Sequence, residues 1–372
     1  MIVVKEVLSK KDLVKFVKFP FRLYKNSPYW VPPIIKEEVA TLDKTKNPVF
    51  KNADARFFLA YKDGEIAGRI AAIINHHEVQ QQQQKKLRFG WFDVIDDLSV
   101  TEALFNRISE YGKEQGLAYM EGPCGFSTMD KAGMLVKGFD RTSNMTTHYN
   151  HAYYPEHLEK LGFTKSMDWV EDFIHTPKKV PEKVKKYASL VLQRYELKLL
   201  KFSSAEELIS YADKMFELMN RSFKDLPSFA PVQPYQIAQY KKKYLKYIHP
   251  DFITFIADKN DDLVGFSITM PSFAKALQKA KGRLFPFGFI HLLRAQKKIE
   301  TGNLYLIGIA PEYQGKGLTA VIFQDVMINF IKRKIKYVQT NPELEDNMAV
   351  RSLWKDYNPQ LIKRWRSYKK SL

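Results

Sequence analysis

The residues best suited to chemistry lie in a short glycine-rich loop, APEYQGKGLTAVIFQ, at positions 310–324. An apolar run over 304–309 precedes the loop and a helical pattern follows it, so the sequence predicts a strand, a tight loop and a helix in immediate succession. Such an arrangement directs several backbone N–H groups and the positive end of a helix dipole toward one point. Phosphate suits that point, although an ordinary strand-to-helix turn would show the same order of elements.

The spacing of the glycines excludes the two common nucleotide-binding loops. The pattern GxxxxGK followed by Ser or Thr fails because, counting from Gly308, Tyr313 stands where the second glycine should be. The pattern GxGxxG fails because Gly315 and Gly317 are followed by Ala320. The loop is therefore either an ordinary strand-to-helix turn or a site for a phosphate-bearing cofactor of another kind.

The run IGIAPEYQGKG resembles the acyl-CoA-binding motif of the GCN5-related N-acetyltransferase (GNAT) superfamily, in which an apolar strand and Ala-Pro precede QxxGxG or QxxGxA. The resemblance implies that the loop amides hold the pyrophosphate of acetyl-CoA or a longer acyl-CoA, bound as co-substrate, while the preceding strand pairs with pantetheine. Thr319 departs from the Gly or Ala that is usual at its position. The cofactor-binding residues expected from the resemblance are Ile307, Ile309, Gln314, Gly315, Lys316, Gly317, Leu318, Thr319 and Asn347.

The catalytic groups are less clearly marked. Acyl transfer from a thioester to an amine needs a neutral amine, stabilisation of the oxyanion and a proton for the leaving thiolate. The resemblance implies an oxyanion donor among the backbone amides of 307–309, where Gly308 permits close backbone approach; a strand bulge without a ligand is the alternative. It also implies a tyrosine acid in a later helix, but Trp354 occupies that place in NMAVRSLWKDY. Tyr357, about one turn onward, is the candidate acid, with a packing role as its alternative.

No single residue stands out as the general base. The candidates near expected strand ends are Glu300, Tyr305, Glu343 and Glu345, each of them more typical of a solvated or capping residue, and bulk water could also accept the proton. No metal is expected, because the pairs His76–His77 and His148–His151 do not form a recognisable zinc pattern. No dedicated base accompanies Cys124, which favours an incidental thiol over a nucleophile.

The elements that position these residues follow the same order twice. Hairpins are predicted over 56–74, around the Asp63–Gly64 dipeptide, and over 253–270. Further helices are predicted around Leu104, Ile108 and Tyr111, over 153–163 with Gly162 as its cap, and over 203–223, and a last strand over 364–370. Each half reads helix, hairpin, strand, helix, strand, helix, strand, which favours an internal duplication.

The expected fold class is α/β, with two tandem GNAT-like domains, each a mixed and mostly antiparallel sheet flanked by helices. The length of 372 residues also favours two domains. We place the boundary in the proline- and lysine-rich segment 176–187. Residues 1–178 then form a degenerate domain without the CoA loop, since FGWFDVIDDLSVTEALF has no glutamine-glycine loop. Residues 179–372 form the CoA-binding domain, with an insertion at 271–302.

Composition limits the partners. The net charge of +18 favours anionic partners, namely nucleic acid, an acidic lipid surface or a phosphate-rich cofactor. Basic residues spread among amphipathic helices make nucleic acid the least favoured of these. A single cysteine, no apolar run of about 18 to 20 residues and no signal-peptide pattern indicate a cytoplasmic protein.

The insertion is the most informative segment for the acceptor. Seven lysines and arginines bracket LFPFGFIHLL, a composition that suits peripheral contact with an anionic membrane or an acyl-chain tunnel; a helical lid on the protein itself is the alternative. With the motifs GRLFPFGF (282–289), FPFRLYKNSPYWVPP (19–33) and GMLVKGFD (133–140), the whole chain resembles a bacterial group of tandem acetyltransferase-like proteins. Some related acyltransferases are implicated in sphingolipid synthesis. The expected function is therefore transfer of an acetyl or longer acyl group to an amine, including lipid amines such as a sphingoid base. The alternative is a non-catalytic CoA-binding or membrane-surface protein.

Overall fold

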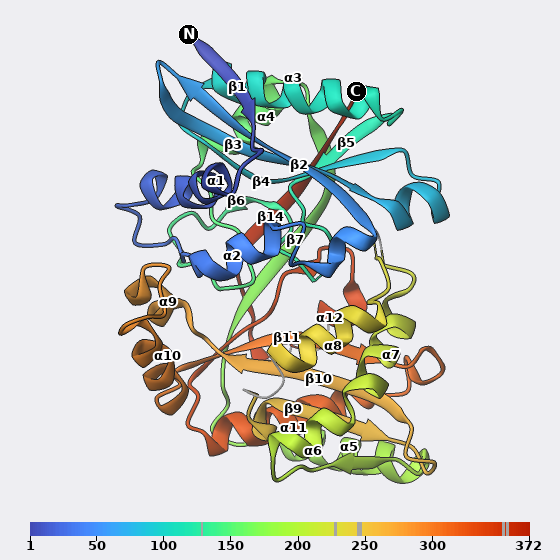
Figure 1. Ribbon diagram of the computed structural model, residues 1–372. Helices are drawn as coiled ribbons and strands as arrows, with labels where there is room; N and C mark the ends of the chain where they lie inside the picture. The colour runs from blue at the N-terminus through green and yellow to red at the C-terminus, as the bar shows by residue number, and fades with distance from the viewer. Residues whose placement is uncertain (128, 227–228, 244–247, 352–353, 355–356) are drawn as a thin grey trace. The chain divides into compact units, whose positions relative to one another are not determined.

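The computed structural model describes residues 1–127, 129–226, 229–243, 248–351, 354 and 357–372 (Figure 1). The chain divides into two compact units. Unit 1 comprises Met1–Val170, Phe273–Arg294 and Ile362–Leu372, and unit 2 comprises Glu171–Ser272 and Ala295–Leu361. Residues 273–294 of the insertion and residues 362–372 at the C-terminus thus belong to unit 1, although both follow unit 2 residues in the sequence.

Unit 1 is built on a sheet that helices cover on both faces. Its neighbouring strands are, in order, β1 (Ile2–Glu6), β2 (Ala53–Lys62), β3 (Glu65–Asn75), β4 (Lys86–Val94), β5 (Tyr119–Gly122) and β14 (Gln360–Ser371). All these pairs are antiparallel except β4 with β5. β6 (Met134–Lys137) pairs with β14, which also neighbours β7 (Thr164–His175).

Alternation along β2 explains how unit 1 fills two core layers. Phe58 and Ala60 join one apolar cluster, and Phe57 and Leu59 join another, because successive side chains of a strand point to opposite faces. The first cluster takes in residues of α3 (Leu98–Glu114) and α4 (Tyr153–Lys160), and the second residues of α1 (Lys10–Leu23) and α2 (Ile35–Leu42). The central sheet is therefore buried on both sides.

Unit 2 repeats this strand pattern. Its strand order is β8 (Lys198–Leu200), β9 (Ile253–Ala257), β10 (Leu263–Pro271), β11 (Thr301–Ile309) and β12 (Tyr337–Gln339), followed by the end of β7 (Figure 1). Only β11 with β12 is parallel among these pairs, as β4 with β5 is in unit 1. Its other elements are α5 (Glu182–Arg194), α6 (Ala205–Ser210), α7 (Ala212–Phe223), α8 (Pro234–Lys243), α11 (Leu318–Lys332), β13 (Glu343–Leu344) and α12 (Met348–Arg351). The matching order and directions agree with an internal duplication.

Most predicted elements are confirmed. In the first hairpin Asp63 and Gly64 have φ values of 51° and 86°, as a tight hairpin turn requires. The predicted helix over 203–223 is instead two helices, α6 and α7, which meet at Tyr211. Helix α5 begins at Glu182, inside the segment that the sequence marks as a boundary. The mixed, mostly antiparallel sheet flanked by helices is the predicted fold class.

Candidate functional site

Strand β11 has one edge that is largely open. It pairs with β10 along most of its length, with an irregularity opposite Ile268 and Thr269. On its other side, within the described part of the chain, the pairing with β12 covers only Thr301–Asn303. The next four residues, 304–307, are all half-buried rather than fully covered. Because an unpaired strand edge presents N–H and C=O groups, this edge could pair with an extended ligand.

The glycine-rich loop follows directly and leaves several amides open. Gly315 and Gly317 have φ values of 73° and 84°, and Gly317 caps α11 without any side-chain hydrogen bond. Among the described residues, the backbone N–H groups of Gly315, Gly317, Leu318 and Thr319 find no acceptor in the protein. The side chain of Leu318 is fully buried, which fixes the start of the helix. Four donors at a helix N-terminus form a site for an anion.

Side chains from α5 and its C-terminus border this loop. A Cβ atom at Gly317 would lie 2.6 Å from the hydroxyl of Tyr187, a residue of α5. The Lys316 Nζ lies 5.3 Å from the ring centroid of Tyr195 and 5.1 Å from that of Tyr313. The sequence gives no signal for Tyr187 and Tyr195, because both precede the loop by more than a hundred residues.

Hydrogen bonds to one carbonyl brace the end of β11. The hydroxyl of Ser222 and the Nε2 of Gln314 both donate to the carbonyl of Ile309, at 2.9 and 3.3 Å. Gln314 thus stabilises the loop with its side chain. On the same strand, a Cβ at Gly308 would lie 2.2 Å from the ring of Phe266, so close packing across the strands already accounts for a glycine there. The oxyanion role of the Gly308 amide stays a prediction.

In the C-terminal part of unit 2, Trp354 occupies the position expected for the tyrosine acid, and it packs against α11. Trp354 is only 3% exposed and its ring meets that of Phe323 edge-on at 4.9 Å. Asn347 accepts a hydrogen bond from the Val350 amide at 3.3 Å and so caps α12, while the side chain of Tyr357 is half-buried. Asn347 and Tyr357 remain predicted site residues, and Trp354 has a clear packing role.

Among the candidate bases, Glu343 has a strongly shifted pKa. Burial and the neighbouring Asp172 raise the pKa of its carboxyl group to about 8, although Arg351 and the indole of Trp354 act in the opposite direction. Neither its Oε2 nor the Trp354 Nε1 makes a well-formed hydrogen bond among the described residues. A buried carboxyl group with a spare oxygen and a pKa near neutrality is suited to proton transfer.

The other three candidate bases lie at different places around β11 and α12. Glu300 is exposed and lies 3.7 Å from the ammonium of Lys336. Tyr305 is half-buried, and its carbonyl accepts a hydrogen bond from the side chain of Asn341 at 3.1 Å. This contact places the segment after β12 next to the open part of β11. The carbonyl of Glu345 accepts a hydrogen bond from Arg351, which ties it to α12.

The corresponding position in unit 1 is closed. β4 pairs in parallel with β5 only from Lys86 to Arg88 in the described residues, as β11 does with β12. Beyond this point the Cys124 amide donates to the Phe89 carbonyl at 2.8 Å, and a Cβ at Gly90 would lie 2.2 Å from the Cys124 carbonyl oxygen. The chain itself therefore occupies the edge of β4.

The helix that follows β4 is also unsuited to phosphate. Asp97 caps α3, and its carboxylate accepts a hydrogen bond from the Ser99 amide at 2.9 Å. The same carboxylate pairs with Lys62 at 2.5 Å. A carboxylate at the helix N-terminus takes the place that an anionic ligand would need.

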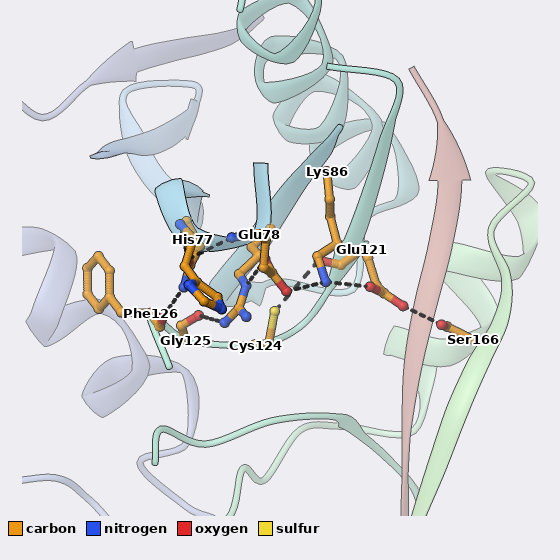
Figure 2. Close-up of polar contacts among 10 residues, drawn as sticks. His77, Glu78, Lys86, Glu121, Cys124, Gly125, Phe126 and Ser166 are labelled. Atoms are coloured by element: carbon orange, nitrogen blue, oxygen red, sulfur yellow. Dashed lines mark hydrogen bonds and ion pairs between the residues drawn. The ribbon is translucent and has the colours of Figure 1, made fainter. Parts of the chain in front are cut away.

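A buried ionic network holds the closing segment of unit 1 (Figure 2). The Lys86 Nζ lies 2.6 Å from Glu78 and 3.1 Å from Glu121, and the Arg88 Nε lies 2.7 Å from Glu78. Arg88 also donates to the Gly125 carbonyl at 2.9 Å. Burial raises the pKa of the neighbouring Cys124 thiol to about 11. The thiol is therefore protonated at neutral pH, as expected for an incidental cysteine.

Two curated proteins are similar to this chain over most of its length. No protein-family model matches the chain. It is 28% identical to Protein YghO of Escherichia coli K12 over 99% of this chain and 95% of that protein. It is 24% identical to the bacterial ceramide synthase of Caulobacter vibrioides, over 83% of this chain and 80% of that protein.

Solved structures with the same fold are acetyltransferases of the GNAT type. A tandem GNAT protein from the clavulanic acid biosynthesis pathway is similar with a TM-score of 0.56 and 10% identity, over 100% of this chain and 98% of that one. A GCN5-related N-acetyltransferase from Sphaerobacter thermophilus gives 0.53 and 11%, over 100% and 95%. The chain therefore has the tandem GNAT fold. Along the described residues, no helix is both long and apolar enough to cross a membrane.

Proposed function

We propose that this chain is an acyl-CoA-dependent N-acyltransferase, and that unit 2 alone binds the acyl-CoA. One observation carries the proposal: four backbone amides without an acceptor lie at the start of α11, directly after the open edge of β11. Pyrophosphate fits the amides and the extended pantetheine arm fits the strand edge. Unit 1 offers neither feature, because Cys124 closes its edge and Asp97 caps its helix.

The proposed roles follow from this arrangement. The amides of Gly315, Gly317, Leu318 and Thr319 hold the pyrophosphate, and Lys316 adds a positive charge beside it. Ile307 and the backbone N–H of Ile309 face the pantetheine arm, since the Ile309 carbonyl already accepts hydrogen bonds from Ser222 and Gln314. When bound, acyl-CoA supplies the thioester carbonyl that the acceptor amine attacks.

Proton transfer is the task left to the side chains of this chain. The new C–N bond forms as the C–S bond breaks, the amine loses a proton and the thiolate gains one. Glu343 can hold a proton at neutral pH because its pKa is raised to about 8, which suits protonation of the thiolate. Tyr357 is the second candidate for this role, and the Gly308 amide for the oxyanion.

The acceptor we propose is an amine with a large apolar part. The Caulobacter vibrioides relative is a ceramide synthase by name, and a ceramide is the N-acyl derivative of a sphingoid base. The apolar and basic insertion agrees with such an acceptor, which would approach from a membrane.

The second candidate function is that of a CoA-binding protein without catalytic activity. It is favoured by the buried Trp354, which stands where a catalytic tyrosine is expected.

The test of cofactor binding uses position 319. Thr319 lies in the first turn of α11, where a carboxylate is favourable for the helix but repels pyrophosphate. We expect CoA, acetyl-CoA and palmitoyl-CoA to raise the Tm of the wild type and to leave that of Thr319→Glu unchanged. Thr319→Gln, of equal size and without charge, should keep most of the shift. Gly317 is a poorer choice, because any side chain there meets both a left-handed backbone and Tyr187.

Catalysis is tested separately by release of the CoA thiol. Addition of a sphingoid base to the protein with palmitoyl-CoA should release thiol and form the N-acyl product, detected by mass spectrometry. A Tm shift without thiol release for any amine would favour the non-catalytic function. No shift with any CoA species would overturn the whole proposal.

A further inference from the structure

We propose that the insertion of unit 1 is a docking surface for an anionic lipid bilayer. It consists of α9 (Ala274–Ala280), the following turn and α10 (Gly288–Lys297) as far as Arg294, where unit 1 ends. Its tip carries Phe285, Phe287, Phe289 and Leu293. This proposal is about the place in the cell where the protein acts. The observations behind it are independent of those at the CoA site.

One side of the insertion is firmly attached to unit 1. Ala274 and Leu277 of α9 pack in a buried cluster with Val31. The side chain of Gln278 donates hydrogen bonds to the carbonyls of Pro28 and Trp30, at 2.8 and 3.0 Å. α9 is therefore a fixed base for the tip.

The turn that ends α9 is fixed in the same way. The Gly282 carbonyl accepts a hydrogen bond from the Ile35 amide at 2.9 Å. A Cβ at Gly282 would lie 2.5 Å from the ring of Phe21, so the backbone packs directly on that ring. These contacts determine the direction in which the following residues leave unit 1.

The tip is apolar and exposed. Phe285 is 77% exposed, Phe287 is 71% exposed and Leu293 is 52% exposed, and no described residue of α10 is fully buried. Phe285 and Phe289 contact each other, with ring centroids 5.7 Å apart. Large aromatic side chains exposed together mark an interaction surface, because single exposed apolar residues are common but clusters are not.

Charge identifies the partner. No Asp or Glu occurs between positions 272 and 299, whereas the segment 275–294 carries Lys275, Lys279, Lys281, Arg283 and Arg294. Among the described residues, no carboxylate pairs with Lys279, Lys281, Arg283 or Arg294, and all four are exposed. Aromatic rings that enter the acyl boundary, surrounded by cations that meet lipid phosphates, fit the surface of an anionic bilayer. A second protein copy would place this uncompensated positive charge against itself.

Vesicle binding tests this proposal. We expect the full-length wild type to sediment with vesicles of phosphatidylcholine containing about 30% phosphatidylglycerol, and to bind pure phosphatidylcholine at least about tenfold more weakly. Binding should fall as salt rises from about 0.1 to 0.5 M, because salt screens the lysines and arginines. Phe285→Ser combined with Phe287→Ser should lower the partition coefficient by roughly tenfold or more.

Two controls separate the surface from other effects. Leu8 is 84% exposed elsewhere in unit 1, so Leu8→Ser should bind vesicles like the wild type. The Tm shift with CoA should be unchanged in the Phe285→Ser, Phe287→Ser variant, which distinguishes this proposal from the proposed function. Absence of wild-type binding to anionic vesicles, or equal binding by the double variant, would overturn it. The proposal would also be overturned if sedimentation showed that the wild type forms a dimer without binding vesicles, and that the double variant is a monomer.

Discussion

Glu343 is the residue through which pH acts most directly on unit 2. Its carboxyl group is buried beside Asp172, so ionisation places two negative charges close together in a poorly hydrated site. Burial raises the pKa of Asp172 as well, although Arg351 lowers it. The folded protein therefore keeps a proton on Glu343 at pH values where the unfolded chain has lost it.

Stability should consequently depend on pH through Glu343. Because its pKa rises from 4.5 to about 8 on folding, the native state binds more protons than the unfolded state between these values, and the unfolding free energy falls as pH rises through that window. We expect Glu343→Gln to gain on the order of 2–3 kcal/mol relative to the wild type between pH 5.5 and 8.5. Urea denaturation at the two pH values measures this. If the unfolding free energies of Glu343→Gln and the wild type differed by the same amount at both pH values, Glu343 would have an ordinary pKa.

The sequence named Glu343 among four candidate bases but could not choose it. The choice depends on Asp172, which is 171 positions earlier, and on Trp354, whose burial depends on Phe323. Periodicity and spacing describe neighbours along the chain, whereas the pKa of a carboxyl group depends on neighbours in space. The loop at 314–319 was easier to identify, because all its amides come from one contiguous run.

At the scale of elements, the closing segment of unit 1 depends on a neutral set of four buried charges (Figure 2). Burial alone would lower the pKa of Lys86, but the carboxylates of Glu78 and Glu121 more than compensate and raise it. The ammonium thus stays charged at 1% exposure. Removal of one member leaves an uncompensated charge, which is more costly than the absence of the whole pair.

Lys86→Met should destabilise unit 1 by about 3–5 kcal/mol, because two buried carboxylates then face only Arg88. Lys86→Met combined with Glu121→Gln restores neutrality and should recover much of this loss. Thermal unfolding of the wild type, the two single variants and the double variant gives the coupling energy. If the double variant were as unstable as the sum of the singles, the network would have no electrostatic role.

Elements with strong local signals were predictable, and those set by packing were not. The Asp63–Gly64 turn and the Gly162 cap depend on backbone conformations that few residues adopt, so the sequence identifies them directly. The break at Tyr211 between α6 and α7 has no proline or glycine to mark it. Helix α5 was hidden by prolines and lysines, since its few buried residues, Ala188 and Val191, leave a weak pattern.

At the scale of the whole molecule, chain order and packing do not coincide. The last strand of each half pairs within the other unit: β14 with β5 in unit 1, and the end of β7 with β12 in unit 2. The sequence predicts two consecutive domains because hydrophobic patterns carry no information about which sheet a terminal strand joins. Residues 273–294 of the insertion likewise belong to unit 1, although they interrupt unit 2 in sequence.

The number of CoA molecules that the chain binds depends on which of its two units has a free strand edge and a free helix N-terminus. Cys124 and Asp97 occupy in unit 1 the positions that are open beside β11 and α11 in unit 2. We therefore expect isothermal titration of the full chain with CoA to give one site per chain, and Thr319→Glu to abolish all binding. As a matched change in unit 1, Asp97→Asn removes the negative charge at the start of α3 but leaves the edge of β4 closed by Cys124, so the stoichiometry should stay at one. Two sites in the wild type, or a site that survives Thr319→Glu, would mean that unit 1 also binds CoA.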